Sequence, residues 1–302
     1  MSLIKKITRY VFDKDYRWVI NAIHGLHNNL SDKEYISKMF FHKMGYNLDL
    51  DNPVHLSEKL QWLKLNCHDD IQTDLVDKYK VKKIVGNIIG EQYIIKNLGV
   101  WDDVSSIDFE KLPNQFVMKC THNSGKGLCV CDDKNKLNIR KVKHVLKKAL
   151  AEDYYLLYRE WPYKNVTRRI IAEEYLHNSD GSPLVDYKFY CFGGKPRYFM
   201  YSIGEAEHNV KNHKFDMDYH SIDHLFKKKA AIEAKDIILP SNISEMVDIV
   251  NKLCSNFKHV RVDLYNIDGK IYFGEMTFYT NGGFISIDSE EYSDKMAGYI
   301  EI

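Results

Sequence analysis

The residues with the clearest potential for chemistry lie near the end of the chain, in HVRVDLYNIDGKIYFGEMTFYTNGG, which contains Arg261, Asp263 and Glu275. Two runs of β-branched and aromatic residues flank NIDGK, and this pattern predicts a β-hairpin. A three-residue loop ending at Gly269 would give this glycine the position that needs a positive φ. In that register Arg261 lies opposite Glu275. Asp263 lies opposite Phe273, and the two carboxylates become diagonal neighbours, roughly 7 to 8 Å apart at the backbone and able to hold one cation.

The sequence of the hairpin by itself leaves two alternatives to this cation site. A two-residue turn made by Asp268 and Gly269 would send Asp263 and Glu275 to opposite faces of the sheet. In the other alternative the charged residues form a structural ion pair between Arg261 and Glu275 rather than a metal site.

A second informative stretch is VMKCTHNSGKGLCV, which predicts two strands joined by a turn. The first strand ends near Lys119, and the turn contains Ser124, Gly125, Lys126 and Gly127. Free backbone N–H groups beside cations suit a polyphosphate. The glycine spacing does not match a Walker loop, and a strand rather than a helix follows. An ordinary hairpin turn is the alternative interpretation.

The strand IIAEEYL ends with two acids in apolar surroundings. Glu173 or Glu174 would accept a hydrogen bond from an adenine amino group, while the backbone of Tyr175 and Leu176 reads the edge of the ring. The alternative is an edge strand with one solvated acid.

In the segment VDYKFY, Asp186 and Lys188 are two residues apart and so share one face of a strand. The two side chains could therefore simply pair with one another.

The order of predicted elements gives a helical cap, a small α+β part and a larger α+β part. SDKEYISKMFFHKMGY begins with a serine cap and a capping-box glutamate, and NPVHLSEKLQWLKLN begins near a proline. One further helix is expected over TDLVDKYKVKKIVGNIIG. Amphipathic spacing predicts helices in IRKVKHVLKKALAED and SNISEMVDIVNKLCSNF, and VDYKFYCF and PRYFMYSI form a strand pair joined by GGK.

The composition excludes several classes of protein. The charges nearly balance, with 43 Lys plus Arg against 42 Asp plus Glu, so we expect no nucleic-acid partner and a merely solvated patch at Lys227 to Lys229. The six cysteines show no zinc spacing and are expected to be reduced. No apolar run is long enough to span a bilayer, and the N-terminus does not match a signal peptide. We expect a cytoplasmic protein whose N-terminal stretch contacts the inner face of the membrane weakly.

The order of these pieces resembles the ATP-grasp superfamily: Lys78, then Lys119 with a glycine loop, AEEYL, DYK, and Arg-x-Asp with a later Glu. The segments LSEKLQWLKLN, LVDKYKVKKIVGNIIGEQYIIKNLGVWDD, FEKLPNQFVMKCTHNSGKG and DYKFYCFGGKPRYF are similar to its TupA-like branch, which is associated with teichuronopeptide and other bacterial surface polysaccharides. The likeness runs from about Asp51 to the end. It implies an α+β fold in which two lobes grip ATP: a helical region at 1–76, a small lobe at 77–172 and a large lobe at 173–302.

The resemblance also implies which residues bind the nucleotide. Lys78, Lys119 and Lys188 would contact the ATP phosphates, and the loop from Ser124 to Gly127 would cover them. The adenine would be held by Glu173 and by the backbone of Glu174, Tyr175 and Leu176, and Asp180 occupies the position where many relatives bind the ribose hydroxyls.

The same resemblance places Mg²⁺ on Asp263 and Glu275. Many ATP-grasp enzymes have an asparagine two residues after the glutamate, whereas this chain has Thr277 there and its nearest asparagine is Asn281. Either residue could be the third ligand. Arg261 and Lys126 would offset the negative charge that develops during the reaction.

The implied function is an ATP- and Mg²⁺-dependent, ADP-forming carboxylate–amine ligase. It would join an amino acid or other amine to a uronic-acid carboxylate of a surface glycan, or of its nucleotide-sugar or lipid-linked precursor. Three rival functions remain: a phosphotransferase acting on a glycan hydroxyl, a glycosyltransferase, and a non-catalytic nucleotide-binding module.

Overall fold

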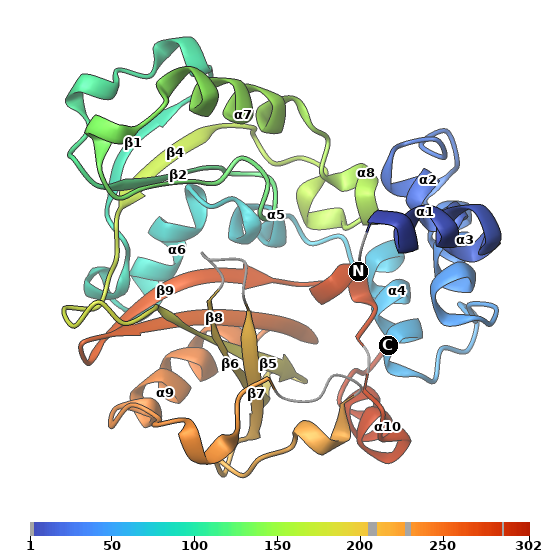
Figure 1. Cartoon of the computed structure of the whole chain (residues 1–302). Helices are drawn as coiled ribbons and strands as arrows, with labels where there is room; N and C mark the ends of the chain where they lie inside the picture. Colours follow the sequence, from blue (N-terminus) through green and yellow to red (C-terminus); the bar gives the residue numbers. More distant parts are fainter. Residues whose placement is uncertain (1–2, 205–209, 227–230, 286) are drawn as a thin grey trace.

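The computed structural model describes residues 3–204, 210–226, 231–285 and 287–302, and the run Lys227 to Lys229 lies outside them. Two antiparallel sheets with flanking helices form an upper and a lower lobe, and the N-terminal helices lie beside both (Figure 1). Short 3₁₀ helices connect these elements: η1 (Glu91–Tyr93), η2 (Val104–Ser106), η3 (Phe109–Lys111), η4 (Lys134–Lys136), η5 (Trp161–Tyr163), η6 (Asp223–Leu225), η7 (Ala234–Asp236) and η8 (Thr280–Gly283).

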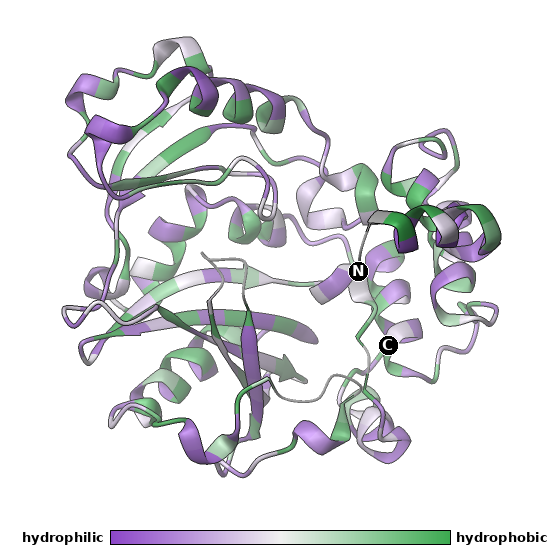
Figure 2. Ribbon diagram, viewed as in Figure 1, coloured by the Kyte–Doolittle hydropathy of each residue, from purple (hydrophilic) through white to green (hydrophobic). Residues whose placement is uncertain are grey.

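The small lobe is a four-stranded sheet in the order β1-β4-β2-β3. Its strands are β1 (Asn97–Trp101), β2 (Phe116–Cys120), β3 (Cys129–Cys131) and β4 (Ile170–Glu174). Helix α7 (Ile139–Ala151) buries Val142, Leu146 and Ala149 in the core that this sheet forms. The apolar strands and the purple outer surface of α7 are visible in Figure 2. The predicted strand pair around the glycine turn and the predicted helix are both confirmed.

The large lobe is a five-stranded sheet in the order β7-β6-β5-β8-β9. The predicted pair β5 (Val185–Phe192) and β6 (Lys195–Ile203) is confirmed, as are α9 (Ile243–Cys254) and the hairpin of β8 (His259–Ile267) and β9 (Lys270–Thr277). The sequence analysis did not predict β7 (Lys211–Asp216), which adds an edge strand to β6. Helix α10 (Glu290–Gly298) follows the sheet.

The N-terminal helices are α1 (Leu3–Phe12), α2 (Lys14–Ile23), α3 (Asp32–Met44) and α4 (Leu56–Asn66). The capping box predicted for α3 is present, since Ser31 and Glu34 exchange the expected hydrogen bonds. Leu56 and Leu60 of α4 join the same buried core as the large sheet, and Lys59 donates to the backbone of α10. Through α4 the N-terminal region is therefore packed on the large lobe rather than separate from it.

The single helix expected over residues 73–90 is wrong, because the chain forms two helices, α5 (Asp70–Val76) and α6 (Lys80–Ile89). Asp77 causes the break. Its carboxylate accepts hydrogen bonds from the backbone N–H groups of Tyr79 and Lys80, at 2.8 and 3.3 Å, and starts α6 anew. The other oxygen of Asp77 pairs with Arg169 at 3.0 Å. The break lets the backbone N–H of Lys78 reach Thr121 beside the glycine loop.

Candidate functional site

The hairpin that carries Asp263 and Glu275 has a different register from the three-residue loop expected. Asp268 and Gly269 form a two-residue turn, with φ angles of 50° and 81°, and Leu264 pairs with Phe273. Continued regularly, this register would put Asp263 and Glu275 on opposite faces. A bulge between Asp263 and Leu264 absorbs one extra residue, and Asp263 then pairs directly with Glu275.

The extra residue in this bulge is Gly274. A Cβ atom there would lie 3.0 Å from the Asp263 carbonyl oxygen and 3.1 Å from a ring carbon of Tyr265. The bulge also moves Arg261 opposite Thr277, and not opposite Glu275 as expected. The alternative of a two-residue turn was therefore right. Its expected consequence, that Asp263 and Glu275 would lie on opposite faces, was wrong, because a bulge cannot be recognised from the alternation of residues alone.

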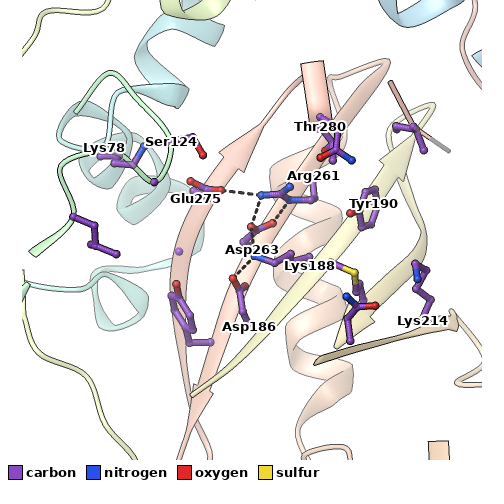
Figure 3. Close-up of a pocket in the computed structure, with 18 of the residues that line it drawn as sticks. Lys78, Ser124, Asp186, Lys188, Tyr190, Lys214, Arg261, Asp263, Glu275 and Thr280 are labelled. Atoms are coloured by element: carbon purple, nitrogen blue, oxygen red, sulfur yellow. Dashed lines mark hydrogen bonds and ion pairs between the residues drawn. The ribbon is translucent and has the colours of Figure 1, made fainter. Parts of the chain in front are cut away.

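Charged side chains form a continuous chain across the floor of the large lobe (Figure 3). The Arg261 guanidinium donates to both oxygens of Asp263 at 2.6 Å and to Glu275 Oε1 at 2.8 Å. Lys188 Nζ lies 3.3 Å from Asp263 Oδ2 and also contacts Asp186. The expected pairs Arg261–Glu275 and Asp186–Lys188 are thus present within one larger network.

The electrostatics of this network differ between its acids: burial and the neighbouring Asp263 raise the pKa of Asp186 to about 7, whereas Glu275 is held ionised. Burial disfavours the Glu275 carboxylate, but the cations Lys78 and Arg261, with Lys188 and Lys119 behind them, hold its pKa at about 2. Burial likewise opposes the charge on Lys188, but Asp263 and Asp186 raise the pKa of its ammonium group. At neutral pH the floor carries closely spaced charges of both signs, which is typical of a site for a polyanion with a metal ion.

The glycine loop faces this floor from the small lobe. Its base is anchored, with Asn123 1% exposed, whereas Ser124, Gly125 and Lys126 are exposed. The Lys78 ammonium donates to the Asn123 carbonyl at 2.6 Å. Gly127 has a φ of 74°, and a Cβ there would lie 2.5 Å from the Ala149 side chain, so this position requires glycine.

Two lysines of the small lobe share one buried acid. Glu173 is 4% exposed, and its oxygens lie 2.6 Å from Lys119 Nζ and 2.7 Å from Lys82 Nζ. Burial opposes its charge, but Lys119 and Lys82 lower the pKa of Glu173. The alternative of an edge strand with one solvated acid is wrong about the strand, because β4 lies between β1 and β2, but one of the two acids, Glu174, is indeed exposed. Lys82 was not recognised in the sequence, since its pairing with Glu173 depends on long-range packing.

A cavity of about 760 Å³ lies between the loop and the floor. It brings together ten of the predicted residues: Lys78, Lys119, Ser124, Gly125, Lys126, Lys188, Arg261, Asp263, Glu275 and Asn281. It also contains residues that the sequence analysis did not assign, among them Asn123, Tyr190, Lys214 and Thr280. The side-chain nitrogen of Asn123 and the hydroxyl of Thr280 are buried without a hydrogen-bond partner among the described residues. Lys214 lies on β7, so its place in the cavity could have been predicted only if that strand had been predicted.

Other predicted residues lie outside this lining. The carboxylate of Glu173 lies behind Lys119, and Gly127 supports the base of the loop. Glu174 is exposed, 4.0 Å from Lys96. The three remaining adenine and ribose candidates follow β4 in an irregular segment: Tyr175, Leu176 and Asp180. In this segment Ser179 bonds to Asp268, so it contacts the turn of the β8–β9 hairpin.

The donor set of the floor fits a magnesium ion. Mg²⁺ prefers oxygen ligands, and Asp263 and Glu275 present carboxylates from directly paired positions. Among the described residues, no hydrogen bond or ion pair reaches Glu275 Oε2. Thr277 Oγ1 lies 3.3 Å from Glu275 Oε1, whereas Asn281 lines the cavity itself. A metal ion at Asp263 would share that carboxylate with Arg261.

Comparison with family models identifies one family. A family model described as TupA-like ATPgrasp matches residues 58–300. No curated protein matches the chain.

Several solved structures are similar at low identity. D-alanine–D-alanine ligase from Bacillus anthracis complexed with ATP is 16% identical, with a TM-score of 0.40 over 80% of this chain and 62% of that one. L-amino acid ligase from Bacillus licheniformis is 15% identical, with a TM-score of 0.42 over 84% and 56%. The ATP-grasp ligase PsnB complexed with minimal precursor, Mg and ADP is 8% identical, with a TM-score of 0.42 over 94% and 75%. The chain thus spans less than two thirds of the first two ligases.

Proposed function

The chain belongs to the TupA-like ATP-grasp family, whose model matches residues 58–300, and we propose that it is an ATP- and Mg²⁺-dependent, ADP-forming carboxylate–amine ligase. The superfamily consists of ATP-dependent ligases, which is the premise for this proposal. The acceptor that we propose is a uronic-acid carboxylate of a bacterial surface polysaccharide or of its nucleotide-sugar or lipid-linked precursor. The amine is an amino acid or a similar small molecule.

The observation that carries the proposal is the pairing of a cationic loop with an acidic floor across one cavity. Lys78, Lys119 and Lys126 enter the cavity from the small lobe, and Asp263 and Glu275 enter it from the large lobe. The lysines complement phosphate oxygens, and the acids suit the metal that accompanies them. The cavity volume of about 760 Å³ is within the ordinary range for a cofactor or nucleotide site.

These residues have definable roles in carboxylate activation. Asp263 and Glu275 would hold Mg²⁺, which when bound neutralises phosphate charge and orients the ATP oxygens. The acceptor carboxylate would attack the terminal phosphoryl group, so that an acylphosphate forms and ADP leaves, and Arg261 and Lys126 would stabilise the negative charge that accumulates there. Removing one such donor costs roughly 2.7 to 4 kcal/mol of transition-state stabilisation. An amine then displaces phosphate from the acylphosphate to form an amide.

The uronic-acid part of the proposal is supported by a cation beside a closed aromatic wall in the same cavity. Tyr190 and Tyr198 both line it, and their rings are stacked with centroids 4.5 Å apart. Because these rings are only 8% and 1% exposed, they shape the wall, and the acid group of the sugar is left to pair with a cation. The carboxylate of such a sugar would then face Arg261, which lines the same cavity.

The proposed function is tested by trapping the acylphosphate with hydroxylamine. The full chain is incubated with Mg–ATP and glucuronic or galacturonic acid, free and as UDP-sugars, and we expect ADP, phosphate and a hydroxamate. With amino acids in place of hydroxylamine, mass spectrometry should show an amide. A stable phosphoester instead would indicate a phosphotransferase, and a glycosidic product without ADP would indicate a glycosyltransferase. Either result would overturn the proposal.

A further inference from the structure

A second cavity, of about 460 Å³, adjoins the nucleotide cavity. The two share Ser124, Arg261, Glu275 and Asn281, so they meet beside the acidic floor. The remaining lining residues come from α3, from α8 (Tyr155–Tyr158) and its neighbours, from β9 and its end, and from η8. Through Lys43 of α3, the N-terminal region therefore contributes to a space that adjoins the proposed nucleotide site beside Glu275.

Glu160 is the unusual residue of this second cavity. It is 4% exposed, and no described residue donates a hydrogen bond to its carboxylate or forms an ion pair with it. The nearby Lys64 ammonium is engaged elsewhere, since it donates to the carbonyls of Tyr158 and Gly282 at 2.9 Å each. Burial raises the pKa of Glu160 to about 7, although Lys64 and Arg261 oppose this shift. A buried acid without a partner is costly unless a ligand supplies a cation.

Lys43 brings the opposite charge to the same cavity. Its ammonium lies 4.1 Å from the ring centroid of Phe284 and 4.6 Å from that of Tyr158, in cation–π contact. Within the described part of the chain, no acid lies within ion-pair distance of Lys43. Besides Arg261 and Glu275 of the floor, the cavity thus offers one carboxylate and one ammonium group, Glu160 and Lys43, and among the described residues these two do not form an ion pair with each other.

We propose that this second cavity binds an α-amino acid co-substrate, whose ammonium group pairs with Glu160 and whose carboxylate pairs with Lys43. The proposal rests on the ligase function, and it names the amine and its binding site. A zwitterion satisfies both charges at once, whereas a neutral sugar would leave Glu160 without a partner. The volume of about 460 Å³ suits a molecule of amino-acid size rather than an oligosaccharide. The shared residues Arg261 and Glu275 place this ligand beside the site of phosphoryl transfer.

Direct binding tests this subsite without requiring turnover. The full chain, saturated with Mg–ADP, is titrated calorimetrically with each standard amino acid and with D-alanine and D-glutamate. We expect binding to the wild type and at least tenfold weaker binding to Glu160→Gln and Lys43→Met. Glu110→Gln is the matched control, because that acid is exposed and lies outside both cavities. No binding to the wild type, or equal binding to Glu160→Gln, would overturn the proposal.

Hydroxylamine separates this proposal from the proposed function. It is uncharged at neutral pH and carries no carboxylate, so the ratio of hydroxamate to amide formed by Glu160→Gln should exceed that of the wild type, because only the KM for the amino acid rises. If amino acids bind but no hydroxamate forms in any variant, the ligase function fails and the amino-acid subsite stands. If the KM for the amino acid is unchanged in Glu160→Gln, the assignment of Glu160 is wrong.

A second, independent observation concerns helix α1 at the N-terminal edge. Every side chain from Ile4 to Phe12 is exposed, including four large apolar ones: Ile4 (77%), Ile7 (56%), Val11 (52%) and Phe12 (83%). Ile4, Ile7 and Val11 have the spacing of a single helical face. Lys5, Lys6 and Arg9 lie outside this face by helical spacing, and Arg9 pairs with Asp13 at 3.0 Å.

We infer that α1 lies on an anionic lipid surface, with its apolar face in the headgroup boundary and the long side chains of Lys5 and Lys6 reaching back to the lipid phosphates. An amphipathic helix of this kind binds through apolar area together with charge, and each Lys or Arg contributes about 1 kcal/mol near an anionic leaflet. Among the described residues, no helix has the length and apolar character needed to cross a bilayer. Surface contact would bring the site close to a lipid-linked acceptor.

Vesicle sedimentation tests this inference. We expect the full chain to sediment with phosphatidylglycerol-containing vesicles, but only weakly with pure phosphatidylcholine or at high salt. Ile7→Asp should release it, whereas Ile238→Asp, at a residue that is 90% exposed elsewhere, should not. Equal sedimentation of both variants would overturn the inference. So would a lipid-free dimer that Ile7→Asp dissociates, because the apolar face would then belong to a second copy of the chain.

Discussion

Glu173 shows how a single buried acid can organise the cations of the nucleotide cavity. Its carboxylate holds Lys119 and Lys82 at 2.6 and 2.7 Å. We predict that Glu173→Gln lowers the free energy of unfolding by about 3 kcal/mol, because two buried ammonium groups lose their counter-ion. Urea titration at pH 7 measures this loss. The control is Glu174→Gln, where the exposed neighbouring acid should change stability by less than about 0.5 kcal/mol.

The pH dependence of this effect follows from the lowered pKa of Glu173. A carboxylate with a lowered folded-state pKa contributes stability above its ordinary value of 4.5, and loses it as the pH falls through the folded-state value. The difference between wild type and Glu173→Gln should therefore be full at pH 7 and shrink below about pH 4.5. A difference that stays constant down to pH 3 would show that Glu173 acts through packing and not through charge.

At the residue scale, the order of the motifs along the chain was enough to predict several charged residues of the nucleotide cavity. Lys78, Lys119, Asp263 and Glu275 line one cavity, although they come from distant segments. Glu160 could not be predicted, because its significance depends on the absence of a partner in three dimensions.

At the element scale, the bulge at Gly274 determines whether the two floor acids share a face. We predict that Gly274→Ala destabilises the protein by about 1 kcal/mol or more, because the new Cβ crowds the Asp263 carbonyl. It should also weaken Mg–ATP binding, since the bulge aligns Asp263 with Glu275. Calorimetry measures the affinity. Gly298→Ala is the control, because the new Cβ atom there meets no atom within 4 Å. If the Mg–ATP affinity is unchanged in both variants, the bulge does not have this role.

Periodicity predicted the elements whose apolar faces are regular, such as α7 and α9. It failed where a side chain interrupts a regular pattern. Asp77 splits one expected helix in two by capping the second, and β7 has a largely polar sequence, KNHKFD, that gives little strand signal. The register of the hairpin failed for a similar reason, because only tertiary packing shows where an extra residue is accommodated.

At the scale of the whole molecule, α4 ties the N-terminal region to the large lobe. Leu60 is fully buried in the core that contains the large sheet. We predict that Leu60→Ala lowers the free energy of unfolding by about 3 kcal/mol through the lost burial and the cavity left behind. Leu26→Ala, at a leucine that is 62% exposed, should cost less than about 0.5 kcal/mol. Similar unfolding midpoints in urea for the two variants would show that α4 is not part of this core.

The most direct measurement of the central claim is the melting temperature with Mg–ATP, beside Mg²⁺ with a panel of UDP-sugars, for the wild type and Glu275→Gln. Glu275 is ionised at neutral pH, because neighbouring cations hold its pKa at about 2 against the effect of burial. ATP at a hundred times its dissociation constant should stabilise the wild type by about 2.7 kcal/mol, or about 5 °C. We predict this rise for the wild type and its loss in Glu275→Gln. A shift with UDP-sugars alone, or an equal shift with Mg–ATP in both proteins, would contradict the assignment of the hairpin as the metal-binding floor of an ATP site.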